Sequence, residues 1–114
     1  MSKRKTGTYY EEAAIAYLSE RGVKIVDRNV HCGRIGEIDI IGEGEGCLIF
    51  FECKYRESDK FGSSLDAVTY SKQKTIRKCA EYYLLKHPTN LFIRFDVIGF
   101  DKDICTWIKD AFQV

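Results

Sequence analysis

The segment from Leu48 to Phe51 most constrains the fold, because it is apolar at every position. A short run of this kind is typical of a β-strand that is buried on both faces. The run ends in Glu52-Cys53-Lys54, so two charges stand where a core strand should finish. Glu52 and Lys54 are two residues apart and leave the same face of a strand. Because an unpaired buried charge costs several kcal/mol, we expect a compensating ion or ligand here.

The remaining pattern predicts a helix, three strands, a second helix and two further strands. Thr8 and Glu11 have the spacing of a capping box, which predicts a first helix over about residues 9 to 21. A second, long helix ends before Pro88, the only proline in the chain. Its apolar positions keep helical spacing and are Leu65, Val68, Ile76, Cys79, Ala80, Tyr83 and Leu84. We expect strands at residues 23–30, 35–41, 47–55, 92–100 and 104–108.

These elements predict one α/β domain that spans residues 1–114. Of the 114 residues, 45% are hydrophobic and 31% are charged, which is ordinary for a folded domain. A central, mixed, five-stranded sheet flanked by helices is the economical way to bury both of its faces.

Charge and composition limit the classes of function. The formal net charge of +1 excludes a polycation that binds nucleic acid indiscriminately, so any basic surface must be local. Residues 6–12 are polar where a secretory signal needs an apolar stretch, and no segment approaches the ~20 apolar residues of a membrane span. We therefore expect a cytoplasmic protein without membrane contact. The five cysteines are odd in number and widely spaced, which predicts buried free thiols.

The turn between Asp39 and Glu52 decides whether their carboxylates meet. A two-residue turn of Gly44-Glu45 would make Glu52 the diagonal neighbour of Asp39 on the same face. A turn of Glu45-Gly46 would place the two acids directly opposite each other, again on one face. A plain three-residue turn would send them to opposite faces. Glu37 shares the face of Asp39, where a solvated strand residue is the simpler interpretation.

Two ionised carboxylates ~5 Å apart repel by about 3 kcal/mol at an effective dielectric constant near ~20, so they share a proton or a cation. Oxygen ligands of this kind suit Mg²⁺ or Mn²⁺. Lys54 could orient a water molecule or stabilise the charge that develops on a phosphate. The alternative is an ordinary ion-pair cluster of Asp39, Glu52 and Lys54 at one end of the sheet. The spacing of these residues does not decide between the two.

A series of short motifs, in order along nearly the whole chain, resembles a known family. They are Gly7 with Glu11, Tyr17-Leu18, Gly22, Arg28-Asn29, Gly36-Glu37-Ile38-Asp39-Ile40-Ile41, Phe51-Glu52-Cys53-Lys54, Phe61-Gly62, Lys72-Gln73, Arg94-Phe95-Asp96-Val97 and Asp110-Ala111-Phe112. Together they resemble the bacterial YraN family, which is itself similar to archaeal Holliday-junction resolvases of the PD-(D/E)xK nuclease superfamily. This family usually has glycine at the position of Tyr10 and threonine at the position of Tyr55.

The resemblance implies a restriction-endonuclease-like fold and a metal-dependent DNA endonuclease that hydrolyses phosphodiester bonds, with branched DNA as one candidate substrate. Asp39 and Glu52 would bind Mg²⁺ or Mn²⁺, Lys54 would be the catalytic lysine, and Glu11 would be the acid carried by the first helix. Glu11 has a second explanation as the capping-box partner of Thr8. The alternative function is a nucleic-acid-binding or protein-interaction module with the same fold and little or no catalysis.

Basic and polar residues near the predicted site are candidates for contacts with DNA. They are Lys54, Arg56, Lys72, Gln73, Lys74 and Arg77. A solvated helix face explains Lys74 equally well. The resolvase resemblance also implies a homodimer, whose interface could be the strand edge at residues 104–108 or the apolar pair Ala111-Phe112. Arg94 and Asp96, two apart on one strand, are expected to neutralise each other.

Overall fold

The computed structural model describes residues 3–56 and 68–113, with side chains described from residue 9 in the first helix and up to residue 55 in the third strand. Its elements are α1 (Lys3–Glu20), β1 (Lys24–His31), β2 (Glu37–Gly44), β3 (Cys47–Arg56), α2 (Tyr70–Lys86), β4 (Phe92–Asp101) and β5 (Ile104–Phe112). The predicted order of helix, three strands, helix and two strands is confirmed. No helix among the described residues has the length and apolarity needed to cross a membrane.

The five strands form one mixed sheet in the order β1-β2-β3-β4-β5. The pairs β1–β2, β2–β3 and β4–β5 are antiparallel, whereas the central pair β3–β4 is parallel. The parallel pair follows from the connection, because the segment that contains α2 carries the chain back before β4 begins. The predicted mixed, five-stranded sheet is therefore confirmed.

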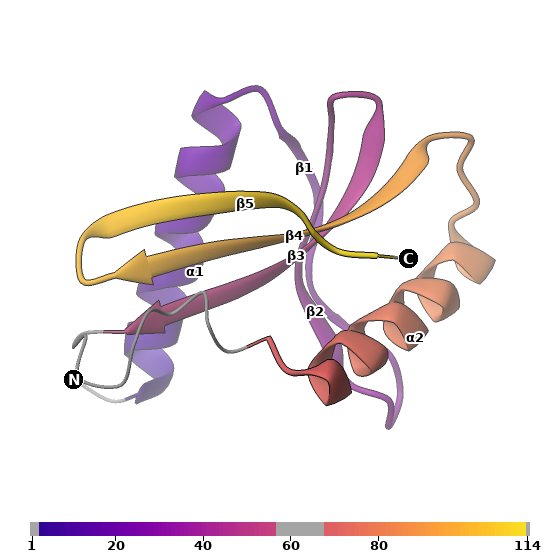
Figure 1. The fold of residues 1–114 in the computed structure, drawn as a ribbon, viewed down its shortest axis with the longest axis horizontal. Helices are drawn as coiled ribbons and strands as arrows, with labels where there is room; N and C mark the ends of the chain where they lie inside the picture. The colour runs from indigo at the N-terminus through magenta and orange to yellow at the C-terminus, as the bar shows by residue number, and fades with distance from the viewer. Residues whose placement is uncertain (1–2, 57–67, 114) are drawn as a thin grey trace.

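The two helices cover opposite faces of the sheet, as Figure 1 shows. On β3, Leu48 and Phe50 pack in the core cluster under α2, whereas Ile49 and Phe51 pack in the cluster under α1. The continuous apolar run thus supplies both cores in alternation. Both faces of this central strand are buried, as the run predicts.

The start of α1 differs from the prediction. The helix begins at Lys3, so Thr8 lies inside it and cannot be its N-cap. The predicted capping box of Thr8 and Glu11 is wrong for this reason, since an N-cap residue must lie at the helix terminus. Glu11 consequently needs another explanation.

The second helix begins later than predicted. Its N-cap is Thr69, whose hydroxyl accepts a hydrogen bond from the backbone N–H of Lys72 at 3.1 Å. Val68 precedes the helix and packs against the core under α2, although it keeps helical spacing with Ile76. Leu65, also predicted to be helical, lies outside the described residues.

Glycine at position 36 allows α2 to approach the sheet closely. A Cβ atom at Gly36 would lie 2.7 Å from Cγ2 of Thr75, and its φ of +153° disfavours other residues. The carbonyl of Gly36 also accepts a hydrogen bond from the backbone N–H of Cys32 at 2.9 Å. The turn before β2 therefore lies directly against the first half of α2.

A buried ion-pair network ties β4 to β5 and to the turn after β2. Asp96 has no exposed surface and accepts hydrogen bonds from Arg94, from the indole N–H of Trp107 and from the backbone N–H of Asp110. Arg94 also donates to Glu45 at 2.7 Å, and Lys109 pairs with the same carboxylate. The expectation that Arg94 and Asp96 neutralise each other is confirmed.

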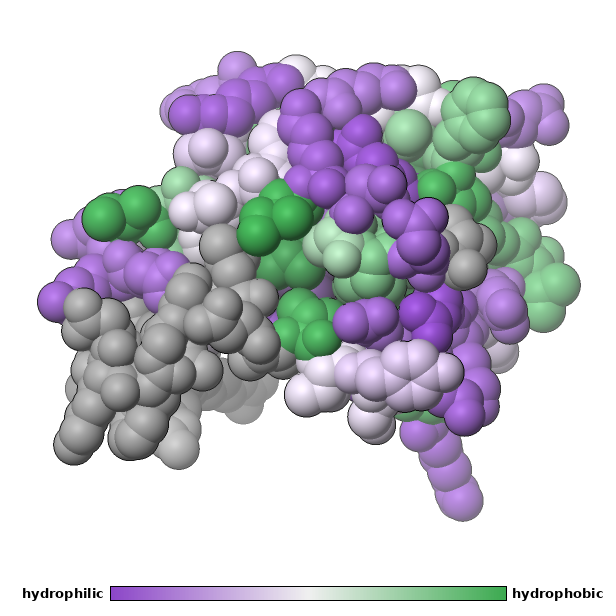
Figure 2. All heavy atoms as spheres, in the orientation of Figure 1, coloured by the Kyte–Doolittle hydropathy of each residue, from purple (hydrophilic) through white to green (hydrophobic). Residues whose placement is uncertain are grey.

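Hydrophilic and hydrophobic residues are interspersed on the face shown in Figure 2. Strongly exposed hydrophobic side chains include Leu85, Phe92 and Ile104. Phe112, by contrast, is buried and stacks on Phe95 with ring centroids 5.0 Å apart. The suggestion that Phe112 forms a dimer interface is therefore wrong, because its ring already packs in the core.

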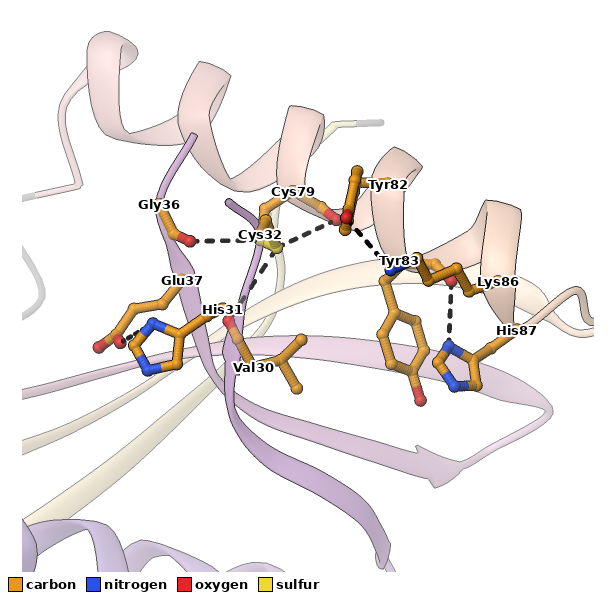
Figure 3. Close-up of a disulfide and its surroundings, with 10 residues drawn as sticks. All are labelled: Val30, His31, Cys32, Gly36, Glu37, Cys79, Tyr82, Tyr83, Lys86 and His87. Carbon is orange, nitrogen blue, oxygen red and sulfur yellow. Dashed lines mark hydrogen bonds and ion pairs between the residues drawn. A yellow bond between two sulfur atoms is a disulfide. The ribbon is translucent and has the colours of Figure 1, made fainter. Parts of the chain in front are cut away.

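Two of the cysteines form a disulfide (Figure 3), which corrects the prediction of free thiols throughout. Cys32 follows β1 and Cys79 lies in α2, with their Cα atoms 5.5 Å apart. Both residues are buried, as predicted, whereas Cys47, Cys53 and Cys105 are free and partly buried. The spacing could not reveal the pair, because the two cysteines meet only where α2 crosses the end of β1.

Candidate functional site

Strands β2 and β3 separate where the two predicted metal ligands lie. Their last paired residues are Ile40 and Phe51, so Asp39 and Glu52 are the next residues on each strand. The turn is Glu45-Gly46, with φ angles of 57° and 76°, which confirms the second of the three registers predicted above. Side chains two apart on a regular strand lie on the same face of the sheet. Ile38 packs on the α2 side and Ile40 on the α1 side, so the alternation of side chains along β2 is interrupted at Asp39.

Asp39 is fixed by the backbone of the neighbouring strand. Its Oδ2 accepts a hydrogen bond from the backbone N–H of Cys53 at 2.9 Å. Cys53 lies beyond the last residue pair of β2 and β3, so this carboxylate takes the role that a backbone carbonyl of β2 would have in a continued sheet. Burial, followed by the charge of Glu52, raises the pKa of Asp39 to about 7. The carboxylates of Glu11 and Glu37 act in the same direction.

Glu52 lies on the α2 side of β3 and is only 7% exposed. Its Oε1 lies 3.6 Å from Nζ of Lys72, which extends from the first turn of α2. Burial raises the pKa of Glu52, and the positive charges of Lys72 and Lys54 oppose this shift. The predicted pair Glu52 and Lys54 thus gains a second lysine from a different element.

Glu11 reaches the same region from α1. Its charge contributes to the raised pKa values of Asp39 and of the Cys53 thiol. Its Oε1 is buried and has no hydrogen-bond partner within the described part of the chain. Buried carboxylate oxygens usually have a partner, so this atom has the capacity to accept a hydrogen bond or to bind a cation.

Glu37 completes a group of four acids that we call the acidic cluster: Glu11, Glu37, Asp39 and Glu52. Glu37 was expected to be solvated, and its side chain is 44% exposed and lies 3.4 Å from Nδ1 of His31. Its charge also raises the pKa values of Asp39 and Glu52. Four carboxylates offer the oxygen ligands that Mg²⁺ and Mn²⁺ prefer. In residues 3–56 and 68–113, however, no group of three or more His, Cys, Asp or Glu side chains is placed so that it could hold a metal ion.

An aromatic pair flanks the cluster. Tyr10 precedes Glu11 and Tyr55 follows Lys54, and their rings stack with centroids 4.6 Å apart. Tyr10 also contacts Phe100, and it is 7% exposed, so the pair packs in the core under α1. Tyr10 and Tyr55, two of the positions at which the chain departs from the YraN family pattern, thus contact each other directly.

The predicted DNA-contacting residues fall into two groups. Lys72 reaches the acidic cluster, and the neighbouring Gln73 donates its side-chain amide to the carbonyl of Val68 at 3.1 Å. Lys74 and Arg77 instead line a groove of about 340 Å³ on the flank of α2. The other residues of this groove are Lys78, Ala80, Glu81, Leu84, Ile93 and Phe95. The side chain of Arg56 lies outside the described residues.

Comparisons with known proteins identify relatives along almost the whole chain. Residues 10–100 match the model of the uncharacterised protein family UPF0102. A UPF0102 protein of Lachnoclostridium phytofermentans is 42% identical over 99% of this chain and 97% of its own. UPF0102 proteins of Nitrosococcus oceani and Legionella pneumophila are each 38% identical, over 97% and 96% of this chain and 94% and 96% of their own. With a matching family model and relatives aligned along almost their full length, the chain belongs to the UPF0102 family of YraN-like proteins.

Proposed function

We propose that this protein is a metal-dependent DNA endonuclease with a restriction-endonuclease-like fold, and that it hydrolyses phosphodiester bonds in DNA, with branched DNA as a candidate substrate. The observation that carries the proposal is the acidic cluster with two lysines beside it, at the point where β2 and β3 separate. A cluster of carboxylates with a buried oxygen that lacks a hydrogen-bond partner favours cation binding. Phosphodiester hydrolysis is a chemistry that combines such a cation with lysines.

Carboxylate oxygens are the ligands that Mg²⁺ and Mn²⁺ prefer, and this donor chemistry supports the proposed metal. Asp39 and Glu52 are the proposed ligands, and Glu11 is the proposed third acid, because its Oε1 is the buried oxygen without a partner. When bound, the metal would neutralise phosphate charge and lower the pKa of a water molecule. Asp39 is already held in place by the N–H of Cys53, so one ligand is oriented before any metal arrives.

The lysines have the proposed roles of binding and stabilising the phosphate. Lys54 lies two residues after Glu52 on β3, and its charge acts on that carboxylate. It would stabilise the negative charge that develops on the phosphate. Lys72 and Gln73 would contact the DNA backbone next to the acids, while Arg56, Lys74 and Arg77 would extend the contact if the duplex follows α2.

Branched DNA and a homodimer both rest on the resemblance to archaeal Holliday-junction resolvases. Two symmetric cuts need two sites, which a two-fold dimer provides. β5 is an edge strand of the sheet, and its Ile104 is 70% exposed. Of the two interfaces considered for a dimer, this edge at residues 104–108 is the proposed contact, because Phe112 is buried within the chain.

A second candidate function is a DNA-binding module without catalysis. It is favoured by the position of Lys72, which already neutralises Glu52, and by the lack of a ready metal geometry among the described residues. A cleavage assay separates the two candidates. The assay uses linear, flapped and four-way DNA with Mg²⁺ or Mn²⁺; a nuclease cuts at least one of them, whereas a binding module only retards their migration.

The substitution Glu52→Gln tests the metal site directly. The amide keeps the shape of the side chain but removes a charge that burial and Glu37 disfavour. We expect loss of Mn²⁺ binding in titration calorimetry and loss of any cleavage, with an equal or higher melting temperature. Glu43→Gln, an exposed change on β2, is the matched control and should leave Mn²⁺ binding intact.

The opposite outcome has a clear meaning. If Glu52→Gln unfolds the protein and leaves Mn²⁺ affinity unchanged, the cluster stabilises the fold and does not bind metal. The proposal of a nuclease then fails, and the DNA-binding module replaces it.

A further inference from the structure

The ammonium of Lys72 lies against the carboxylate that the proposed metal needs. Nζ of Lys72 is 3.6 Å from Oε1 of Glu52, and the Lys72 side chain is 43% exposed while that of Glu52 is 9% exposed. The lysine thus covers a buried acid from the solvent side. The root of its side chain is fixed, because the backbone N–H of Lys72 is bonded to the N-cap Thr69.

A divalent cation and this ammonium would compete for the same carboxylate. An ammonium is a donor without lone pairs, so Lys72 cannot join the metal as a ligand while protonated. The two positive charges would also repel each other at this short range. The lysine stem is long and flexible, however, and the exposed head can leave Glu52 without disturbing the helix.

We propose that Lys72 is a displaceable counter-ion of the acidic cluster. In the metal-free protein it neutralises Glu52, and a divalent cation replaces it there and turns the ammonium toward solvent, where it meets a DNA phosphate. This inference rests on the proposed function. It couples the two ligands, because metal binding supplies the positive charge that DNA binding uses.

Titration of metal-free protein with Mn²⁺ tests the competition. Lys72→Met keeps much of the apolar stem and removes the charge, so we expect it to bind Mn²⁺ about tenfold more tightly than the wild type, a difference of about 1.4 kcal/mol. Lys74→Met is the matched control, because it removes the same charge two residues away on the exposed surface of α2. Its Mn²⁺ affinity should equal that of the wild type.

Chemical labelling of the lysines provides a second readout that does not depend on cleavage. An amine-reactive acylating reagent is applied with and without Mn²⁺, and the modification of each lysine is quantified by peptide mass spectrometry. Labelling of Lys72 should rise severalfold with Mn²⁺, whereas labelling of Lys74 should stay constant.

The failures of the two proposals are distinguishable. Wild-type protein that binds Mn²⁺ with the same affinity as Lys72→Met, and with unchanged labelling of Lys72, overturns the counter-ion role alone. If neither protein binds Mn²⁺ while both remain folded in thermal melts, the metal site is absent and the proposed function fails with it.

Discussion

At the scale of single residues, the pKa of Asp39 is set by opposing interactions. The N–H of Cys53 favours its charged form, whereas burial and the charges of Glu52, Glu11 and Glu37 favour its neutral form. Burial is the largest of these, and the pKa of Asp39 is raised to about 7. In the metal-free protein near neutral pH, the carboxyl is therefore about half protonated. A metal ligand at this position must lose a proton before it binds.

This pKa predicts a pH dependence of stability. The ordinary pKa of 3.8 applies to the unfolded chain, so between about pH 4 and pH 7 the folded state binds more protons than the unfolded state. The free energy of unfolding should therefore fall as the pH rises through this window, by up to about 4 kcal/mol from Asp39. Urea denaturation in the presence of a chelator, at several pH values across the window, measures the trend.

Asp39→Asn should abolish most of that dependence and should be more stable than the wild type above about pH 7. The exposed Asp27→Asn is the control and should keep the wild-type profile. Parallel profiles for Asp39→Asn and the wild type would show that the raised pKa does not exist in solution.

At the scale of helices and strands, the position of α2 depends on one glycine. Gly36→Ala should destabilise the protein by about 1–3 kcal/mol, because the new Cβ would meet Cγ2 of Thr75 and the backbone would be strained. Gly33→Ala is the control: it has a φ of +58° but nothing within 4 Å of the new Cβ, so it carries only the backbone cost of roughly 1 kcal/mol. Urea denaturation compares the two.

A double variant shows whether the contact itself is responsible. Adding Thr75→Ser to Gly36→Ala removes the Cγ2 atom and should recover part of the lost stability. If Gly36→Ala and Gly33→Ala cost the same, the close approach of α2 is not a tight contact.

The stability of the sheet also depends on the buried network at Asp96. Arg94→Met would leave the fully buried Asp96 carboxylate without its cation and should cost about 3–5 kcal/mol. Glu45→Gln alters an exposed member of the same network and should cost less than about 1 kcal/mol. Chemical denaturation of both variants at one pH measures the difference, and equal losses would mean that burial does not set the strength of this network.

The elements were predictable to the extent that local patterns determine them. The run at Leu48 to Phe51 indicated the central strand, because four successive apolar residues in a short segment are typical of a strand covered on both sides. The start of α1 was not predictable, because Thr8 and Glu11 satisfy a capping pattern that the helix simply continues through. Local spacing indicates that a cap is possible, and it does not tell where the chain stops being helical.

The candidate site was predictable only where it lies on neighbouring strands. The turn Glu45-Gly46, one of three that the sequence allowed, makes Asp39 and Glu52 the next residues beyond the last strand pair, whereas the change of alternation at Asp39 was not predictable. The contact of Lys72 with Glu52 and the Cys32–Cys79 disulfide depend on how α2 crosses the sheet. No periodicity within the helix specifies that crossing, because it is set by tertiary packing.

At the scale of the whole molecule, positive charge is local. The net charge is +1, so any affinity for DNA must come from a few lysines and arginines beside the acidic cluster and on α2. The logarithm of DNA affinity should fall linearly with the logarithm of salt concentration, with a slope set by the phosphates that the protein neutralises. Replacing Lys72, Lys74, Arg77 and Lys78 together by neutral residues should flatten the slope by about 0.9 for each phosphate that is no longer neutralised.

Lys102→Met is the control for this experiment, since Lys102 is exposed in the turn between β4 and β5. It should leave the slope unchanged. Fluorescence anisotropy of labelled DNA at several salt concentrations provides the data. An unchanged slope for the fourfold variant would exclude α2 from the DNA-binding surface.

The parallel pairing of β3 with β4 also governs the order in which the protein can assemble. The pairs on either side of it join strands that are neighbours in the chain, and these form readily because their loops are short. All four acids belong to the first unit, from α1 to β3, whereas Lys72 arrives with the second. Of the two lysines beside the acids, Lys54 therefore comes with the first unit, on β3, whereas the charge of Lys72 reaches Glu52 only when α2 docks on the sheet.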